Sequence, residues 1–283
     1  MLTIFTIPRA FEGEFEVIQK NALLSWSKLK PKPEIILFGD EKGTREMAMK
    51  IGAKHIPEIK RNEFGTPILG WAFNKTKEIA SNYLMGEISG DIILTQDFIE
   101  ALKNIKMKKF LMVGQRWELK VREEIDFEDS NWQEKLKERV LKEGKLQSPS
   151  AIDYFIFPKD FLKEFPPFIV GSPGWDNWLI FKAKELKVPV IDTSKIVLAV
   201  HQTHGRPRKK EKFFEEEKKI NLKLAGGFSR MCTLRDADFV MEKSGILKRP
   251  PFPRRIFSLL SRFYPWQILL GLKRKIQYFF VPW

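Results

Sequence analysis

Two short segments carry the residues best suited to catalysis, Gly174–Trp178 and His201–His204. Asp176 stands where a helix is expected to begin, and the two histidines follow a predicted strand. A carboxylate in such a position can act as a general base that takes a proton from an attacking hydroxyl. It can equally be an acid that only stabilises the helix N-terminus through the macrodipole. We predict Asp176 as the catalytic residue, with the helix-cap role as the alternative.

A third segment, Ser89–Asp91, leads into an apolar strand and offers a carboxylate for a metal ion. Mg²⁺ and Mn²⁺ prefer oxygen ligands and accept substrate phosphates in their shell. A histidine can serve as a further ligand. We predict Asp91 and His201 as metal ligands for a divalent cation, Mn²⁺ or Mg²⁺. The alternatives are an ordinary Ser-Gly-Asp turn and a buried structural histidine.

Other polar residues fall at the predicted ends of strands or in the loops after them. Arginine binds phosphate well through its forked donors, and carboxylates accept hydrogen bonds from a base or ribose. Trp175 and Trp178 offer flat surfaces for a sugar and are predicted to bind the acceptor. The predicted nucleotide-sugar-binding residues are Thr6, Arg9, Asp40, Arg61, Asn62, Asp91, Gln115 and Arg116.

The elements that must position these residues alternate along the chain. Apolar, β-branched runs predict strands at 2–7, 34–38, 54–57, 91–94, 110–114, 152–157, 188–192 and 196–201. Helical spacing of apolar residues predicts helices at 14–29, 43–52, 67–84, 96–106, 132–143 and 174–187. Strands separated by helices favour an α/β fold, a mostly parallel central sheet between helical layers. Ligands of such sheets bind beyond the carboxyl ends of the strands. The charge-dense segment 208–219 is expected to be a solvated helix or a mobile loop, with a lid as the alternative.

The composition bounds the class of protein. Hydrophobic residues make up 43% and charged residues 30% of the 283 residues, which is typical of a globular domain. A single cysteine, Cys232, excludes a disulfide framework. We expect no secretory signal and no membrane-spanning helix, because no apolar run approaches about 18 residues.

The positive charge is concentrated at the C-terminus. Residues 243–283 carry nine of the 50 Lys and Arg and none of the 36 acidic residues, so most of the net charge of +14 lies there. We therefore predict a body domain at 1–242 and a basic, aromatic-rich amphipathic helical tail at 243–283. The tail is expected to bind an anionic membrane surface through residues 250–283. Packing on the body or on a second subunit is the alternative, and nucleic acid is not expected as a partner.

Taken in order, the motifs of residues 1–240 resemble a glycosyltransferase family of the nucleotide-diphospho-sugar transferase type. They are LTIFTIPRAFEG, VIQKNALLSWSKL, EIILFGDEKG, RNEFGTP, SGDIIL, FLMVGQRW, IDYFIFP, GWDNWLI and AVHQTH. The resemblance implies the GT-A fold, with Asp91 at the metal motif, Asp176 at the catalytic-base motif and His201 at the C-terminal histidine. It also implies that Asp153 and Tyr154 line the acceptor side. Members of the family usually carry Asp-x-Asp at the metal motif, whereas this chain has Ser-Gly-Asp. The resemblance therefore does not imply a strict requirement for a metal ion.

These expectations combine into one hypothesis, an inverting glycosyltransferase for a surface polysaccharide or glycolipid. Asp176 would deprotonate an acceptor hydroxyl while a nucleoside diphosphate leaves. The location expected for it is cytoplasmic, associated peripherally with the inner face of the cell membrane. The alternatives are a non-catalytic nucleotide-sugar or glycan-binding module and a sugar nucleotidyltransferase, although Pro8–Gly13 is a poor match to the glycine-rich loop of the latter.

Overall fold

The computed structural model describes residues 1–205 and 211–249, whose central element is a nine-stranded sheet. Its strand order is β13-β12-β10-β6-β9-β4-β1-β2-β3. The strands are β1 (Leu2–Thr6), β2 (Glu34–Phe38), β3 (Lys54–Ile56), β4 (Leu84–Ile88), β6 (Leu111–Gln115), β9 (Ile152–Pro158), β10 (Val190–Asp192), β12 (Phe239–Glu242) and β13 (Gly245–Lys248).

Most neighbouring strands of this sheet are parallel. The pairs β1–β2, β1–β4, β2–β3, β6–β10 and β10–β12 are parallel, whereas β9 runs antiparallel to both β4 and β6. Strands such as Glu34–Phe38 are nearly continuous apolar runs because helices cover both faces of the sheet. The expected α/β fold with a mostly parallel sheet is therefore confirmed.

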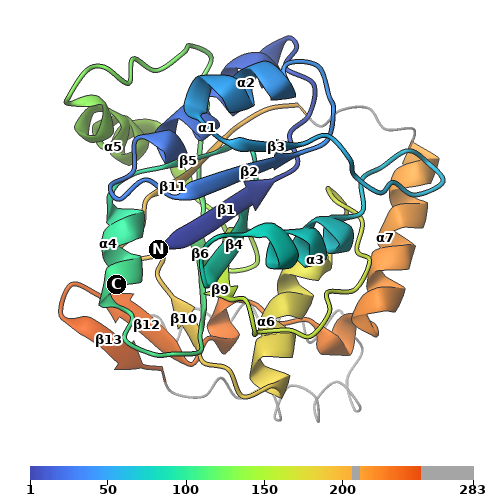
Figure 1. Ribbon diagram of the computed structural model, residues 1–283. Coiled ribbons are helices and arrows are strands. Elements are labelled where there is room, and N and C mark those ends of the chain that lie inside the picture. The colour runs from blue at the N-terminus through green and yellow to red at the C-terminus, as the bar shows by residue number, and fades with distance from the viewer. Residues whose placement is uncertain (206–210, 250–283) are drawn as a thin grey trace. The chain divides into compact units, whose positions relative to one another are not determined.

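Six helices of the described residues form the two outer layers (Figure 1). One face of the sheet is covered by α1 (Glu14–Ser27), α2 (Thr44–Ile51) and α4 (Asp97–Asn104), whose buried residues share a core with Ile4 and Ile156. The other face is covered by α3 (Leu69–Ile79), α6 (Trp175–Glu185) and α7 (Glu211–Ala225), around a core that includes Phe5 and Phe155.

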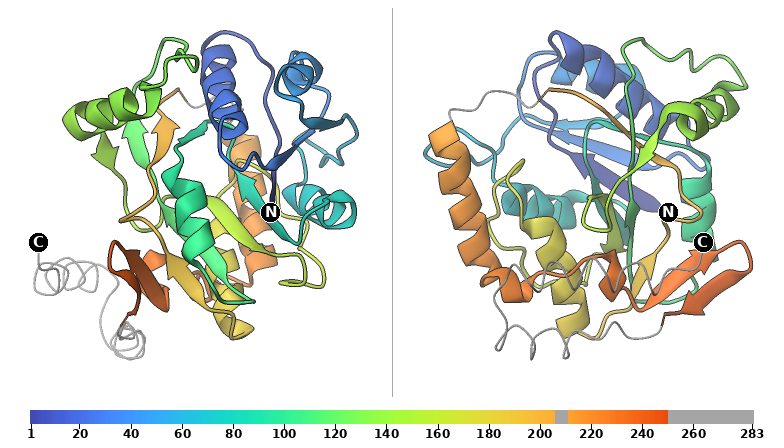
Figure 2. Two further views of the ribbon diagram at one scale, coloured as in Figure 1. Left: turned by 60° about the vertical axis from the view of Figure 1, so that its left-hand side comes forward. Right: turned by 180° about the vertical axis from the view of Figure 1, so that it is seen from behind.

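A second, smaller sheet lies beside the first and has the order β5-β11-β7-β8. It consists of β5 (Ile92–Leu94), β7 (Trp117–Leu119), β8 (Lys145–Leu146) and β11 (Ala199–Gln202), and α5 (Trp132–Glu143) packs on it (Figure 2). In this sheet β11 is antiparallel to β5, with His201 opposite Ile92. The sheet thus brings the segment after Asp91 beside the segment that carries the histidines.

Several boundaries differ from the sequence prediction. The helix predicted at 67–84 ends at Ile79, and the residues that follow form β4, a central strand that the prediction missed. The predicted strands at 91–94 and 196–201 belong to the second sheet. The body extends past residue 242, because β13 pairs with β12 and completes the sheet edge. Most of the segment 208–219, predicted as a solvated helix or a mobile loop, belongs to the helix α7, and the buried residues of that helix include Glu217 and Asn221.

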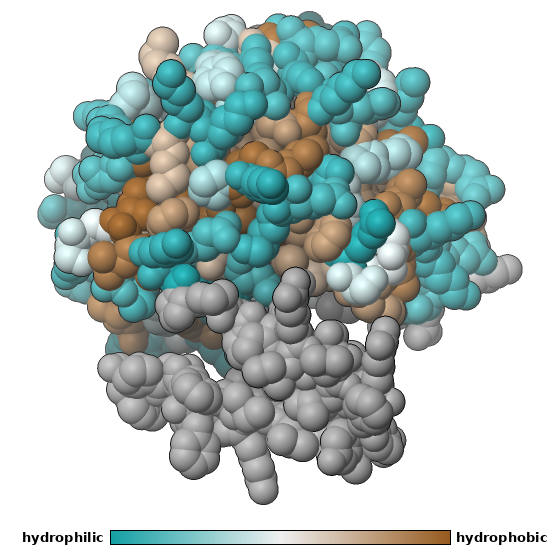
Figure 3. Space-filling view, turned by 90° about the horizontal axis from the view of Figure 1, so that it is seen from below, coloured by the Kyte–Doolittle hydropathy of each residue, from teal (hydrophilic) through white to brown (hydrophobic). Residues whose placement is uncertain are grey.

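Two short 3₁₀ turns, Phe228–Arg230 and Leu234–Asp236, connect α7 to β12. Large apolar side chains are exposed singly, among them Met49, Phe228 and Leu247. Seen from below, apolar patches alternate with polar ones (Figure 3). Scattered exposure of this kind is normal for a folded protein. None of the helices in the described residues combines the length and apolarity needed to cross a bilayer. The predicted tail from residue 250 onward lies outside the described residues.

Candidate active site

Asp91, His201 and His204 converge at the end of the molecule where the parallel strands finish. The Oδ2 atom of Asp91 lies 3.1 Å from Nε2 of His204 and 3.4 Å from Nε2 of His201. The two imidazole rings are 5.2 Å apart between centroids. These three residues offer ligand atoms within 4.8 Å of one another. Such separations are close to those of ligands that share one metal ion at bond lengths of about 2.0–2.2 Å.

The backbone around this cluster is fixed by sheet pairing. Asp91 lies in the turn between β4 and β5, and His201 lies on β11 in register with Ile92. The buried Gln202 donates from its backbone nitrogen and from Nε2 to the Asp91 carbonyl, both at 3.2 Å. It also accepts a hydrogen bond from Asn21 of α1. The backbone that carries Asp91 is therefore held by a buried hydrogen-bond network.

Two buried polar atoms of the cluster have no hydrogen-bond partner among the described residues, which fits a cation-binding role. Within residues 1–205 and 211–249, Oδ1 of Asp91 and Nδ1 of His201 are buried without a hydrogen-bond partner. The ring of His204 lies 2.9 Å from the Gly205 carbonyl through Nδ1. If Nδ1 of His204 carries the proton and donates it to this carbonyl, Nε2 of the neutral ring is an acceptor. Nε2 then faces the Asp91 carboxylate, which is also an acceptor, so a proton or a cation between them would stabilise the pair. Two imidazoles and one carboxylate are a ligand set suited to first-row divalent metals.

The charge of Asp91 is stabilised by its neighbours. Burial alone would raise the pKa of this carboxyl group, but hydrogen bonds and charge from His201 and His204 lower it well below its usual range. The same contact with Asp91 raises the pKa of His204. Burial lowers the pKa of the Arg9 guanidinium, while the charge of Asp91 opposes that effect. Arg9 is anchored through its backbone, which exchanges two hydrogen bonds with Gln19.

Asp176 lies in the first turn of α6. Gly174, with φ of 115°, turns the chain into the helix in a conformation that favours glycine. The Gly174 backbone nitrogen donates to Oδ1 of Asp176 at 3.2 Å. Burial raises the pKa of Asp176 to about 6, with the charge of Asp153 adding to the effect. Backbone hydrogen bonds from Asn177 and Gly174 oppose this rise in the pKa of Asp176.

The two halves of the site are joined by further charged groups. Arg116 donates to Asp153 at 2.6 Å and lies near Glu118 at 3.4 Å. Burial raises the pKa of Asp153 although Arg116 opposes the shift. Glu87 of β4, which the sequence prediction missed, lies close enough to Asp91, Asp153 and Asp176 for the charge of each to act on it. The charges of Asp91, Asp153 and Asp176 therefore all act on Glu87.

Glu217 and Asn221 of α7 form a polar clamp, a pair of buried side chains whose hydrogen bonds fix the loops around Asp176. Glu217 is fully buried and accepts hydrogen bonds from Asn62 at 3.0 Å and from Ser172 at 3.2 Å. Asn221 bonds to both backbone groups of Ile169 and to the Ser172 carbonyl. Asn62 uses its other amide atom to close its own turn. In this structure its amide therefore holds the loops, and its predicted role in nucleotide binding stays a prediction.

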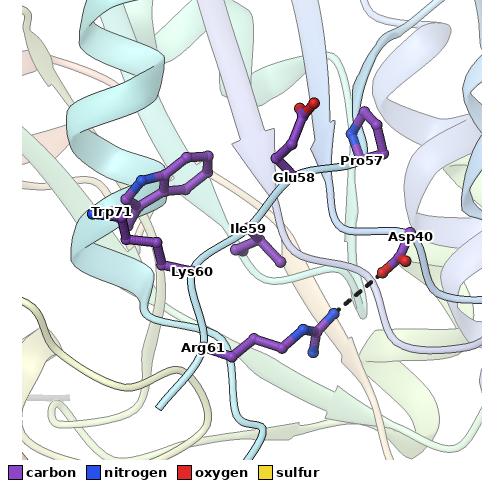
Figure 4. A pocket seen from close by; sticks show the side chains of 7 residues that line it. All are labelled: Asp40, Pro57, Glu58, Ile59, Lys60, Arg61 and Trp71. Atoms are coloured by element: carbon purple, nitrogen blue, oxygen red, sulfur yellow. Dashed lines mark hydrogen bonds and ion pairs between the residues drawn. The ribbon is translucent and has the colours of Figure 1, made fainter.

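A cleft of about 720 Å³ opens beyond the ends of β2 and β3 (Figure 4). It is lined by Asp40, Pro57, Glu58, Ile59, Lys60, Arg61 and Trp71. Arg61 lies 3.4 Å from Asp40 and 2.7 Å from Glu41. The predicted binding residues Asp40 and Arg61 therefore share one opening, and the side chain of Asp40 is 75% exposed.

Three predicted acceptor contacts are contradicted by burial. Trp175 packs against Phe155 with ring centroids 4.7 Å apart, and Trp178 packs against Phe168 at 5.0 Å. Both tryptophans belong to the core below α6, so they are not stacking surfaces for a sugar. Tyr154 is fully buried, and its hydroxyl pairs with Thr193 at 2.8 Å. The prediction failed because strand alternation turns Tyr154 away from the face that holds Asp153.

The remaining predicted residues occupy the expected strand ends. Thr6 is buried at the end of β1. Gln115 ends β6, and its amide donates to the Gln147 carbonyl at 2.6 Å. The missed residue Glu87 had one signal in the sequence, an acidic side chain within an otherwise apolar strand, whereas Glu217 had none because charged residues surround it in α7. Glu87 was overlooked because no strand was assigned to its segment.

Comparison with known proteins gives structural similarity without sequence similarity. No family model matches the chain, and no curated protein matches it. Among solved structures it is similar to TarS of S. aureus (residues 1–349) in complex with UDP-GlcNAc. The identity is 13% over 79% of this chain and 66% of that chain, and the TM-score is 0.50.

A second similar structure is glucosyl-3-phosphoglycerate synthase from Mycobacterium tuberculosis in complex with Mn²⁺, UDP and phosphoglyceric acid. The identity is 14% over 80% of this chain and 78% of that chain, with a TM-score of 0.48. The likeness to TarS shows that the described body has the GT-A fold.

Proposed function

We propose that this protein is a glycosyltransferase that moves a sugar from a nucleoside-diphosphate donor to an acceptor hydroxyl. The observation that carries the proposal is the pair of unlike carboxylates, Asp91 beside two histidines and Asp176 alone at a helix start, within one charged cluster. The fold supports the same class of reaction, because TarS was solved with a nucleotide sugar bound.

Asp176 would be the general base. A carboxyl group with a pKa of about 6 is ionised at neutral pH and still accepts a proton readily. The acceptor hydroxyl would give its proton to Asp176 while its oxygen forms a bond to the anomeric carbon. The bond from that carbon to the diphosphate oxygen would break in the same step, with inversion of configuration.

The opposite half of the site would bind the diphosphate. Asp91, His201 and His204 would hold a divalent cation, which supplies positive charge to stabilise the departing diphosphate. Arg9 lies close enough to Asp91 for their charges to interact and would donate hydrogen bonds to phosphate oxygens. The cleft that contains Asp40 and Arg61 would take the nucleoside, because it opens beside the strand ends that carry the other groups.

Binding of nucleotide sugars is the direct test. Nucleoside diphosphates and nucleotide sugars with Mn²⁺ should raise the melting temperature, because a ligand that binds only the native state stabilises it in proportion to its affinity. Incubation with a stabilising donor and candidate acceptors should then release the free nucleoside diphosphate. The absence of any stabilising nucleotide would contradict the proposal.

The sequence of residues 250–283 supports a membrane-linked acceptor. Its Lys and Arg alternate with apolar and aromatic residues, a composition suited to an anionic bilayer surface. A lipid-linked or surface glycan is therefore the proposed acceptor class. The test is liposome flotation of the full chain and of a chain that ends at residue 249. Equal flotation of both would exclude the tail as the membrane contact.

A further inference from the structure

The amino ends of the strands carry a row of positive charges, at the end of the body opposite to the proposed active site. The chain before β6, the chain before β10 and the end of β13 contribute the segments 103–110, 186–189 and 245–249. Together these segments carry seven Lys and Arg and no acidic residue. They lie together at the lower end of the molecule in Figure 1. This surface, the basic edge, has no part in the proposed reaction.

Strand order makes the basic edge continuous. In the large sheet β13, β12, β10 and β6 follow one another, and neighbouring strands lie about 4.8 Å apart. Lys248 ends β13 and lies in register with Phe239, the first residue of β12. The first residues of β6 and β10 also pair with each other. Lys108 and Lys187, each three residues before those strands, therefore occupy neighbouring positions of the same edge.

The charges of the basic edge are exposed to solvent. Its exposed lysines include Lys106, Lys108, Lys187 and Lys248. The acids beside the edge are Asp160, Glu185 and Asp238, and each of them already pairs with a lysine. The edge therefore presents an excess of positive charge, which attracts an anionic partner within a Debye length of about 8–10 Å.

Apolar side chains are exposed among these charges. Leu186 and Leu247 are each 44% exposed, and each directly precedes a lysine of the edge. Tyr83, directly before β4, is 54% exposed, and its carbonyl accepts a hydrogen bond from the backbone of Lys159. Leucine and tyrosine beside lysine suit the interface of a bilayer, where apolar groups enter the acyl boundary and ammonium groups meet the headgroups. Leucine adds nothing to the binding of nucleic acid, which uses stacking aromatic rings and contacts to phosphate.

The described chain also ends at this edge. The Arg249 backbone nitrogen donates to the Asp238 carbonyl at 2.8 Å, and residues 250–283, whose sequence suits an anionic bilayer, follow directly. We propose that the basic edge is a second membrane contact, formed by the body itself, which binds the headgroups of anionic lipids. The edge and the tail would bind the same bilayer, and two linked contacts hold a surface more tightly than either does alone.

The membrane contact goes beyond the proposed function, because it orients the body. The residues of the candidate site lie beyond the carboxyl ends of the strands, so that site faces away from a bilayer bound at the amino ends. This orientation favours a surface glycan that extends from the membrane as the acceptor, and not a lipid headgroup. The statement about the acceptor rests on the proposed function, whereas the membrane contact does not.

The test removes the charges of the edge in the full chain. The edge variant combines Lys106→Gln, Lys108→Gln, Lys187→Gln and Lys248→Gln. The control variant combines Lys50→Gln, Lys120→Gln, Lys137→Gln and Lys142→Gln, exposed lysines elsewhere on the body, so both variants have the same net charge. Flotation with vesicles of phosphatidylcholine and phosphatidylglycerol in a three-to-one ratio measures the partition coefficient.

The edge variant should lose about 10- to 100-fold of the partition coefficient, since each lysine near an anionic bilayer contributes to binding. The control variant should stay within about threefold of the unaltered protein, because its charges lie more than a Debye length from the bilayer. The loss should shrink at high salt and should vanish on vesicles of pure phosphatidylcholine. Far-UV circular dichroism should be the same for all three proteins, because every substitution is exposed.

A fluorescent label reports the contact itself. Lys108→Cys and Lys142→Cys each give one accessible thiol, because the native Cys232 is buried. Spin-labelled lipid in the vesicles should quench a label at position 108 and leave a label at position 142 unquenched. Equal quenching at the two positions, or none at position 108, would show that the edge does not face the bilayer.

Equal flotation of the edge variant and the control variant would overturn the proposal and leave the tail as the membrane contact. A loss of binding to duplex DNA by the edge variant, with flotation unchanged, would overturn it in favour of nucleic acid. The assays contain no nucleotide sugar. A failure of nucleotide binding therefore counts against the glycosyltransferase proposal alone, and a failure of flotation counts against the membrane contact alone.

Discussion

Asp91 and Asp176 are both partly buried aspartates, yet their pKa values are shifted in opposite directions from the ordinary value. For both, burial alone would raise the pKa. Two histidines reverse that effect at Asp91, whereas Asp176 has only backbone donors and a neighbouring negative charge from Asp153. The comparison teaches that the partner of a buried carboxylate, more than its burial, decides whether it holds a cation or takes a proton.

The two regions are also built differently. The half with Asp91 rests on strand ends, where sheet pairing and Gln202 fix the backbone. The half with Asp176 rests on a helix start after a long loop, and a polar clamp from α7 holds that loop. The first half is therefore rigid through regular hydrogen bonding, while the second depends on a few side chains.

The largest effect is expected from Asp176→Asn, which removes the proposed general base and leaves the metal-binding residues unchanged. Its turnover should fall at least a hundredfold, because general-base catalysis contributes about 10²–10⁴ in rate. Steady-state kinetics measures the turnover, and calorimetry measures the affinity for the donor. Donor affinity should stay the same, and Asp129→Asn, at an exposed ion pair with Lys135, serves as control. An unchanged turnover would remove Asp176 from the chemistry.

The metal half is tested by His204→Ala and His201→Ala. Each should weaken Mn²⁺ binding roughly tenfold or more, since each removes one of three convergent ligands. Calorimetry without substrate gives this affinity directly. His55→Ala is the matched control, because the remaining histidine lies on β3 and bonds to the Gly39 carbonyl. If the His55 variant lost as much affinity as the others, the proposed ligand set would be wrong.

The pH dependence sharpens the contrast between the two acids. The folded pKa of Asp176 is about 6, so kcat/KM should fall about tenfold per pH unit below pH 6 as the base becomes protonated. The stability effect has the opposite direction. Because this pKa is raised on folding, stability is greatest with Asp176 protonated and is lost as pH rises from about 4 to 6.

Burial of the charged Asp176 should therefore cost about 3 kcal/mol of folding stability at neutral pH. Asp176→Asn should recover part of that cost in urea unfolding at pH 7 and gain little at pH 4. A variant that is equally stabilised at both pH values would show that the charge of Asp176 is not the cause.

The smallest effect is expected at the clamp. Asn221→Ala removes buried hydrogen bonds to Ile169 and Ser172 and should cost about 1–3 kcal/mol of stability in urea unfolding. Turnover should fall severalfold with the metal affinity unchanged, since only the loop before Asp176 is loosened. Glu215→Gln, on the exposed side of α7, should change neither. A loss of metal affinity in Asn221→Ala would show that the two halves are not independent.

Local sequence patterns predicted the alternation of strands and helices. They also predicted the candidate site residues that lie at the ends of the strands. Strands such as Glu34–Phe38 and the helix Trp132–Glu143 have the expected bounds, because apolar periodicity is a local property of the chain. The strand that contains Glu87 was missed because Gly86 and Glu87 interrupt its apolar run. The roles of Trp175, Trp178 and Tyr154 were wrong because an aromatic residue looks the same in a sequence whether it faces a ligand or the core.

By itself, the sequence determined the layered α/β fold and the identity of Asp91, Asp176 and His201 as candidates. Residue types and their spacing are enough for that, since they act over a few neighbouring positions. Only the tertiary structure decided that His204 joins Asp91, that Glu87 lies among three carboxylates, and that Asp176 loses solvent. These properties depend on groups that lie far apart in the chain, and solvation and charge act through space.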